Sequence, residues 1–159
     1  MNVLVLGIGN PGRRDDGLGP ALVERLANVS SLDPDIALTA EARVQLNIED
    51  ADLIRGYDLV VFADATTEGG EPVRIEPLKP SATVAFSTHE MPPAAVLALC
   101  EELYDRAPEA WLLLVRGYDW DIGEGLSNEA ERNLRGALEA LLEFVSDQAE
   151  EAEEEAEEE

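Results

Sequence analysis

The sequence has a single cysteine, Cys100, and a single histidine, His89, among its 159 residues. One cysteine cannot form an intramolecular disulfide, which fits a reducing compartment and leads us to expect a cytoplasmic location. Because Cys100 lies on the apolar face of a predicted helix, we expect it to pack in the core rather than to act as a nucleophile. Any site that needs an imidazole must use His89.

Basic residues are also scarce: 11 lysines and arginines stand against 35 aspartates and glutamates, for a net charge of −24. Residues 147–159 hold 9 of the acids and no base. Residues 1–146 therefore keep 26 of the 35 acids with all 11 bases, a net charge of −15. Acidity of this size argues against binding to a phosphate backbone, so we expect no nucleic-acid partner.

Long apolar runs are missing as well. No stretch reaches the roughly 18 consecutive apolar residues of a membrane span, so we expect no transmembrane helix. The opening MNVLVLGIGN has no basic segment before its apolar residues and no small-residue cleavage pattern after them, so a signal peptide is not expected. We expect a monomer that does not associate with membranes.

The sequence does contain apolar runs that alternate regularly with amphipathic segments. Strands are predicted at residues 2–7, 36–41, 58–63, 73–77, 83–86 and 111–116, with one of the two segments around Pro80 as an edge strand. Helices are predicted at residues 19–28, 48–55, 93–105 and 128–146. This alternation predicts an α/β fold: a three-layer α/β/α sandwich with a mostly parallel, twisted sheet of about five strands.

The length suits one domain with a single core, which we place at residues 1–146. Residues 147–159 (DQAEEAEEEAEEE) form an acidic low-complexity tail with no apolar residue larger than alanine. We expect this tail to bury nothing and either to be disordered or to extend the last helix into solvent. At the start of that helix, Asn128 and Glu131 fit a capping box.

The loop after the first strand, GIGNPGRRDDGLG, permits three interpretations. In the first, its glycines match the G-x-G-x-x-G dinucleotide fingerprint, with Glu41 as the acid that binds the ribose. Asp15 and Asp16 argue against this, because they stand where a phosphate needs positive charge. Pro11 and the glycine after it also delay the helix whose N-terminus should hold the pyrophosphate.

In the second interpretation the chain is a phosphoacceptor receiver domain, in which paired acids, an aspartate, a hydroxyl residue and a lysine follow successive strands. Asp15, Asp16 and Asp64 fit this pattern, as does Ser87 or Thr88. However, the acid pair lies well beyond the end of the first strand, and the last strand ends in RGY without a lysine.

The third interpretation is a metal-centred hydrolase. The glycines let the loop fold back and return Asp16 to the sheet edge. Asp64 ends the apolar run VVFAD, and His89 lies between an extended segment and a helix. Carboxyl ends of parallel strands share one edge, so these residues can form a mixed oxygen and nitrogen metal site. Each also has a simpler role: a helix cap for Asp16, a turn to Thr66 or Thr67 for Asp64, and a neutral His89 that donates to a carbonyl.

Four ordered motifs resemble one known family. LVLGIGNPGRRDDGLGP is similar to the opening of the nickel–iron hydrogenase maturation proteases, whose pattern is G-x-G-N, four residues, then D-D/E-G-x-G. Asp64 in VVFADA, His89 in FSTHEM and the block RGYDWDIGEGLSNEAERNL follow in the same order. The resemblance covers residues 2–146, and four ordered motifs are much more specific than one.

The resemblance implies a twisted sheet with helices on both faces. It also implies an endopeptidase that removes the C-terminal extension of a hydrogenase large-subunit precursor after nickel insertion. Asp16, Asp64 and His89 match the catalytic and metal-contacting residues; the family has Glu or Asp at position 16, so Asp16 is the shorter variant. The implied metal is nickel carried by the substrate, with zinc or another divalent metal as the alternative. The peptidase is accordingly expected to be metal-dependent, with aspartic-type activity as the other possibility.

Overall fold

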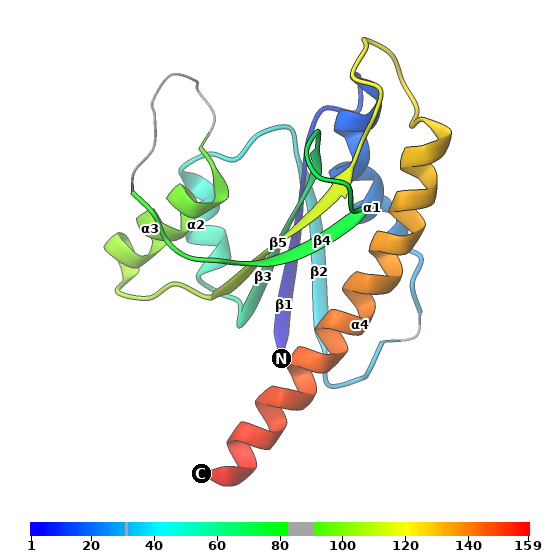
Figure 1. The fold of residues 1–159 in the computed structure, drawn as a ribbon. Coiled ribbons are helices and arrows are strands. Elements are labelled where there is room, and N and C mark those ends of the chain that lie inside the picture. Colours follow the sequence, from blue (N-terminus) through cyan, green and yellow to red (C-terminus); the bar gives the residue numbers. More distant parts are fainter. Residues whose placement is uncertain (31, 83–90) are drawn as a thin grey trace.

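A computed structural model describes residues 1–30, 32–82 and 91–159, and its elements follow the order predicted from the sequence (Figure 1). The strands are β1 (Asn2–Ile8), β2 (Ala37–Arg43), β3 (Leu59–Thr66), β4 (Val73–Leu78) and β5 (Glu109–Arg116). The helices are a short 3-10 helix, η1 (Arg14–Gly17), and the α-helices α1 (Leu18–Leu26), α2 (Glu49–Ile54), α3 (Pro93–Tyr104) and α4 (Asn128–Glu158). The extended segment predicted at residues 83–86 lies outside the described residues.

The five strands form one sheet in the order β2-β1-β3-β5-β4. β1 pairs in parallel with β2 and β3, and β3 pairs in parallel with β5. β4 runs antiparallel to β5 at one edge, where a residue without an N–H group such as Pro77 is tolerated. The mostly parallel five-stranded sheet is therefore confirmed, and the edge strand is the predicted segment that precedes Pro80.

Helices cover both faces of the sheet: α1 and α4 pack on one face, and α2 and α3 on the other (Figure 1). Alternate residues of β1 serve the two cores. Val3 and Val5 pack under α1 and α4, whereas Leu4 and Leu6 pack under α2 and α3. Because both faces of the central strands are buried, their sequences are continuous apolar runs. The three-layer sandwich is confirmed.

β1 and β3 are neighbouring strands in the sheet, and the remaining strands are added on opposite sides of this pair. β2 lies on the far side of β1, whereas β5 and β4 lie on the far side of β3. The carboxyl ends of β1 and β3 are therefore the topological switch point, where ligand sites of open α/β sheets form. In Figure 1 this edge of the sheet is at the top, together with η1 and the loops that follow β2 and β5.

The N-cap of α4 is Ser127 rather than Asn128. The Ser127 Oγ accepts a hydrogen bond from the backbone N–H of Ala130 (3.2 Å), so the predicted capping box is wrong by one residue. Glu131 instead forms an ion pair with Arg25, which links α4 to α1. A tertiary hydrogen bond donated by the Ser127 hydroxyl selects this cap, and local sequence cannot reveal such a contact.

The acidic tail is helical, because α4 continues without a break to Glu158. The expectation that the tail extends the last helix is confirmed, but the expectation that it buries nothing is wrong for one residue. Ala149 is buried, because it continues the apolar stripe of Leu141 and Val145 by one further turn. Neither α4 nor any other helix in the described part of the chain is long and apolar enough to cross a membrane.

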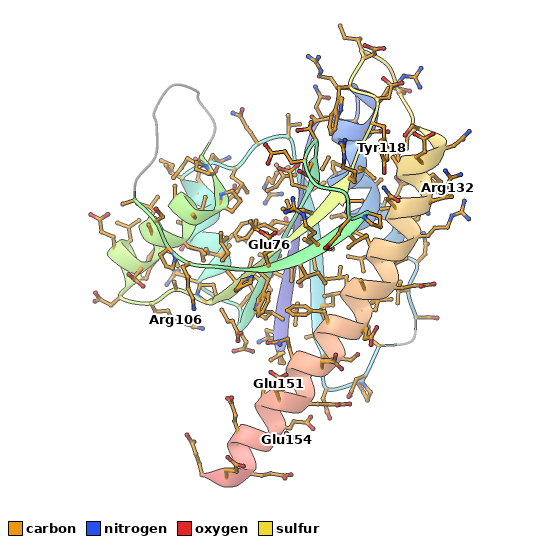
Figure 2. The ribbon with its side chains drawn as sticks, in the orientation of Figure 1. Glu76, Arg106, Tyr118, Arg132, Glu151 and Glu154 are labelled. Carbon is orange, nitrogen blue, oxygen red and sulfur yellow. The ribbon has the colours of Figure 1, made fainter. Side chains whose placement is uncertain are left out.

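The effect of truncating the tail on stability should therefore depend on whether the truncation removes Ala149. Residues beyond Glu150 are exposed, and Figure 2 shows Glu151 and Glu154 on the end of α4 that runs past the sheet. Deleting residues 151–159 should leave stability near that of the full chain. Deleting residues 147–159 removes Ala149 as well and should lower the free energy of unfolding by about 1 kcal/mol. Urea denaturation measures both, and equal losses from the two deletions would contradict this assignment.

Candidate active site

The loop that leaves β1 folds back on the strand within a few residues. Gly9 has a φ of +146°, and a Cβ at this position would lie only 1.9 Å from the carbonyl oxygen of Asp16. The backbone N–H of Gly9 donates to the carbonyl oxygen of Arg43 at the end of β2 (2.9 Å). Glycine therefore permits the tight loop that returns Asp16 to the carboxyl end of β1, which is the placement predicted from the sequence.

Asp16 does not cap α1. The N-cap of that helix is Gly17, which makes no side-chain hydrogen bond, and the first turn of α1 contains no acid. The Oδ2 of Asp16 instead accepts a hydrogen bond from the backbone N–H of Asn10 (2.8 Å), which orients the carboxylate across its own loop. Oδ1 accepts no hydrogen bond from the residues that the structure describes. The cap interpretation of Asp16 is therefore wrong.

Asp64 lies within β3, where it pairs with Leu114 of β5, and the strand continues to Thr66. It is therefore part of the strand rather than of a turn that follows it. Its Oδ1 accepts a hydrogen bond from the backbone N–H of Ala65 (2.8 Å), and its side chain is half-buried. A half-buried carboxylate at this edge keeps contact with solvent, so it is accessible to a substrate.

A close contact between helix and strands brings the two acids to the same part of the edge. A Cβ on Gly19 would lie 2.4 Å from the carbonyl oxygen of Ile8 and 2.7 Å from that of Ala63. The first turn of α1 thus rests directly on the ends of β1 and β3, one residue before Asp64. η1, which contains Asp16, also contacts β3. The structure therefore places both acids at the switch point.

The third predicted ligand, His89, lies outside the described residues. Within the described ranges, no group of three or more histidine, cysteine, aspartate and glutamate side chains could hold a metal ion. A site with three protein ligands that includes Asp16 and Asp64 would therefore need a ligand from outside the described residues, and His89 is the residue predicted from the sequence.

Asp15 is fully buried, a role that the sequence motifs did not predict. Its carboxylate accepts hydrogen bonds from the backbone N–H groups of Tyr118 (2.8 Å), Asp119 (2.9 Å) and Ser127 (2.8 Å), and from the Ser127 hydroxyl (2.8 Å). Burial by itself raises the pKa of Asp15, but the hydrogen bonds outweigh burial and hold the pKa below its ordinary value. Asp15 thus stays ionised, and its hydrogen bonds link the loop after β5 to the loop after β1.

This hydrogen-bonded link explains why the motif RGYDWD accompanies the paired acids. Tyr118 and Asp119 of that motif supply two of the N–H groups that Asp15 binds, from 103 and 104 positions along the chain. The sequence feature that could have indicated this role is the pair of adjacent acids. The proposed site takes only one carboxylate from this loop, that of Asp16, so Asp15 must have another role. The sequence does not indicate which distant segment the second acid would bind.

The same loop is poorly suited to a dinucleotide. The backbone N–H groups of Gly9, Asn10 and Gly12 already donate to protein acceptors. These acceptors are the Arg43 carbonyl oxygen, the Asp16 carboxylate and the Asn10 side chain, respectively. η1 also separates the loop from the N-terminus of α1, which should face the pyrophosphate. The structure therefore argues against the dinucleotide interpretation.

The sheet topology argues against the receiver interpretation. Receiver domains resemble flavodoxin, with the strand order 2-1-3-4-5, whereas here the fourth strand is antiparallel and lies outside the fifth. At the end of β5, where the receiver lysine would be needed, Arg116 donates to the carbonyl oxygens of Thr66 (3.4 Å) and Gly117 (2.6 Å). Its guanidinium also lies over the ring of Tyr118, 5.0 Å from the centroid. Arg116 therefore has a structural role.

Fold and site together define a doubly wound α/β protein with two carboxylates at its topological switch point. No protein-family model matches the chain, and no curated protein matches its sequence. Solved structures do match.

Several of these structures are hydrogenase maturation proteases. The hydrogenase maturating endopeptidase HybD from E. coli matches with a TM-score of 0.75 and 23% identity, over 93% of this chain and 94% of that chain. The nickel–iron hydrogenase maturation protease HycI from Thermococcus kodakarensis matches with a TM-score of 0.68 and 25% identity, over 91% and 92%. A hydrogenase 2 maturation peptidase from a Thaumarchaeota archaeon matches with a TM-score of 0.64 and 23% identity, over 91% and 98%. The chain therefore has the fold of the hydrogenase maturation proteases over nearly its whole length.

Proposed function

We propose that this protein is a cytoplasmic endopeptidase that removes the C-terminal extension of a nickel-loaded hydrogenase large-subunit precursor. The observation that carries the proposal is the loop after β1, which folds back and holds Asp16 beside the strand that contains Asp64. The shared fold and the four ordered motifs support it independently.

The donor atoms at the edge suit a divalent transition metal. Asp16 and Asp64 supply carboxylate oxygens and His89 supplies an imidazole nitrogen, a set that fits nickel or zinc. We propose that the metal is the nickel of the substrate, which these three residues contact while its remaining positions are filled by substrate or water. The chemistry that such a metal would supply there is polarisation of the scissile carbonyl or activation of a water molecule.

The residues of this chain have defined tasks in that reaction. The Asn10 N–H holds one oxygen of Asp16, so the carboxylate presents its other oxygen without reorganising. Asp15 holds the loop on which Asp16 sits, through its hydrogen bonds to the loop after β5. If nickel is part of the substrate, the precursor is cleaved only after nickel insertion, because only the loaded form binds productively. The enzyme then acts as a checkpoint in hydrogenase assembly.

The experiment that tests this proposal is a mass spectrum of the large-subunit precursor after incubation with the protein. The nickel-loaded precursor should lose the mass of its C-terminal peptide, and the nickel-free precursor should keep its full mass. Cleavage of the nickel-free precursor at the same rate would instead indicate an aspartic-type reaction that does not use the substrate's metal. A nickel-loaded precursor that keeps its full mass would refute the proposed function.

A further inference from the structure

Large apolar side chains that are exposed to solvent gather around the candidate active site. The described residues contain six of them: Val44, Ile48, Leu103, Tyr104, Tyr118 and Ile122. Single exposed apolar residues are common and need no explanation. Here, however, four of the six lie on only two loops, and both loops follow parallel strands at the carboxyl edge. We call these four residues, Val44, Ile48, Tyr118 and Ile122, the apolar rim.

Both loops of the apolar rim touch the loop that carries Asp16. On one side, the carbonyl oxygen of Arg43, directly before Val44, accepts a hydrogen bond from the Gly9 N–H (2.9 Å). On the other side, Gly123, directly after Ile122, donates to the carbonyl oxygen of Gly12 (2.9 Å). Gly123 also accepts a hydrogen bond from the backbone N–H of Arg14 (3.0 Å). The apolar rim therefore flanks the candidate site on both sides.

The two loops are held in place by the two buried charged residues of the described chain, Asp15 and Asp50. Asp15 binds the loop after β5. Asp50 accepts hydrogen bonds from the Asn47 N–H (3.0 Å) and the Arg43 Nε (3.2 Å), and Leu46 anchors the same loop in the core. The exposed side chains thus project from fixed backbone, which lowers the conformational entropy that a partner would have to remove.

The charge distribution supports the same conclusion. Residues 44–48 (VQLNI) carry no charged side chain, although the chain has 35 acids in 159 residues. Ile122 is 86% exposed and Ile48 is 64% exposed, so both keep most of their apolar area available for contact. A protein partner that buries this area gains hydrophobic free energy, and the exposed acids that border it, Glu49 on one side and Asp121 on the other, suit a partner with basic residues around its apolar surface.

We propose that the apolar rim docks an apolar surface of the large-subunit precursor around the base of its C-terminal extension. This inference rests on the proposed function. The precursor would contact Val44 and Ile48 on one side and Tyr118 and Ile122 on the other. Its scissile segment would then cross the ends of β1 and β3, where Asp16 and Asp64 lie. The enzyme would thus recognise a folded surface of the precursor on either side of the scissile bond, rather than the sequence around that bond alone.

The test uses Ile48→Ser and Ile122→Ser, with Leu103→Ser as the matched control. Leu103 is 58% exposed, but it lies in the last turn of α3 and belongs to neither of the two loops of the apolar rim. Titration with the nickel-free precursor gives Kd without turnover, and kinetics with the nickel-loaded precursor give KM and kcat. Each rim variant should raise Kd and KM by about tenfold, as expected for one buried apolar contact. The control should change neither.

The outcomes separate this inference from the proposed function. If the wild-type protein cleaves the precursor and the rim variants keep its Kd and KM, the inference fails and the function stands. If the wild-type protein binds the precursor, the rim variants weaken that binding, and no cleavage occurs, the function fails and the docking surface stands. If the protein binds neither the nickel-free nor the nickel-loaded precursor, both fail. If Ile122→Ser abolishes a dimer of this chain without changing Kd, the rim belongs to a second copy and the inference is wrong.

Discussion

Asp64→Asn is expected to lower kcat/KM for the nickel-loaded precursor by about 10³-fold or more, which corresponds to about 4 kcal/mol of transition-state stabilisation. Asparagine keeps the size of the side chain but removes the charge that would face the proposed metal. Asp16→Asn and His89→Ala should have losses of the same order, because each removes one of the three proposed metal contacts. The mass of the processed large subunit, followed over time, gives the rate.

Two controls make this result specific. Far-UV circular dichroism and the Tm of each variant should stay close to those of the wild type, because Asp64 is half-buried in the strand and Asp16 binds only its own loop within the described residues. Asp105→Asn should cleave at the wild-type rate, because Asp105 lies beyond the end of α3 with a φ of +56°, a conformation that asparagine adopts readily. A His89→Ala protein that cleaves at the wild-type rate would remove His89 from the site and contradict the three-ligand assignment.

Asp15→Asn is expected to have the largest effect on stability, a loss of about 3 kcal/mol or more in the free energy of unfolding at neutral pH. The amide has one acceptor oxygen, so its NH₂ group would face buried N–H donors that the carboxylate now satisfies. Urea denaturation measures the loss. Asp121→Asn is the matched control on the same loop, because Asp121 is exposed, and it should change stability by less than about 0.5 kcal/mol.

The effect of Asp15 should depend on pH in a defined direction. The pKa of Asp15 is lower in the folded protein than in the unfolded chain, so folding favours the ionised form. Its contribution to stability is therefore fully present above the ordinary pKa of aspartate and is lost as the pH falls through the lowered value. The stability gap between wild type and Asp15→Asn should be widest at neutral pH and should narrow under acid conditions. A gap that widens in acid would contradict this assignment.

The hydrogen bonds of Asp15 to the loop after β5 also predict that stability and activity are linked. Asp15 and Asp16 are neighbours in η1, but one holds the loop after β5 and the other faces the proposed substrate. Loss of Asp15 should therefore loosen the backbone that positions Asp16, and a folded Asp15→Asn protein should cleave more slowly than its folded fraction accounts for. Such a variant distinguishes a positioning residue from one that contacts the substrate.

Local pattern was sufficient for the elements and for two of the proposed site residues. The apolar runs at β1, β3 and β5 predicted buried strands, because side chains on both faces of a central parallel strand must be apolar. The glycines after β1 predicted a tight return loop, because only glycine tolerates the backbone approach seen at Gly9. These features depend on neighbours within a few residues, so sequence alone determined them, together with the fold class and the edge at which Asp16 and Asp64 lie.

Contacts between distant segments were decided only by the tertiary structure. Ser127 became the cap of α4, and Asp15 became the buried link, because the order of strands brings two loops together that are more than a hundred residues apart. Ala149 is buried because α4 packs against the sheet for one turn beyond the apolar stripe predicted from the sequence. Hydrogen bonds and packing of this kind depend on where the chain returns in space, and a sequence pattern holds no information on that until the sheet order is known.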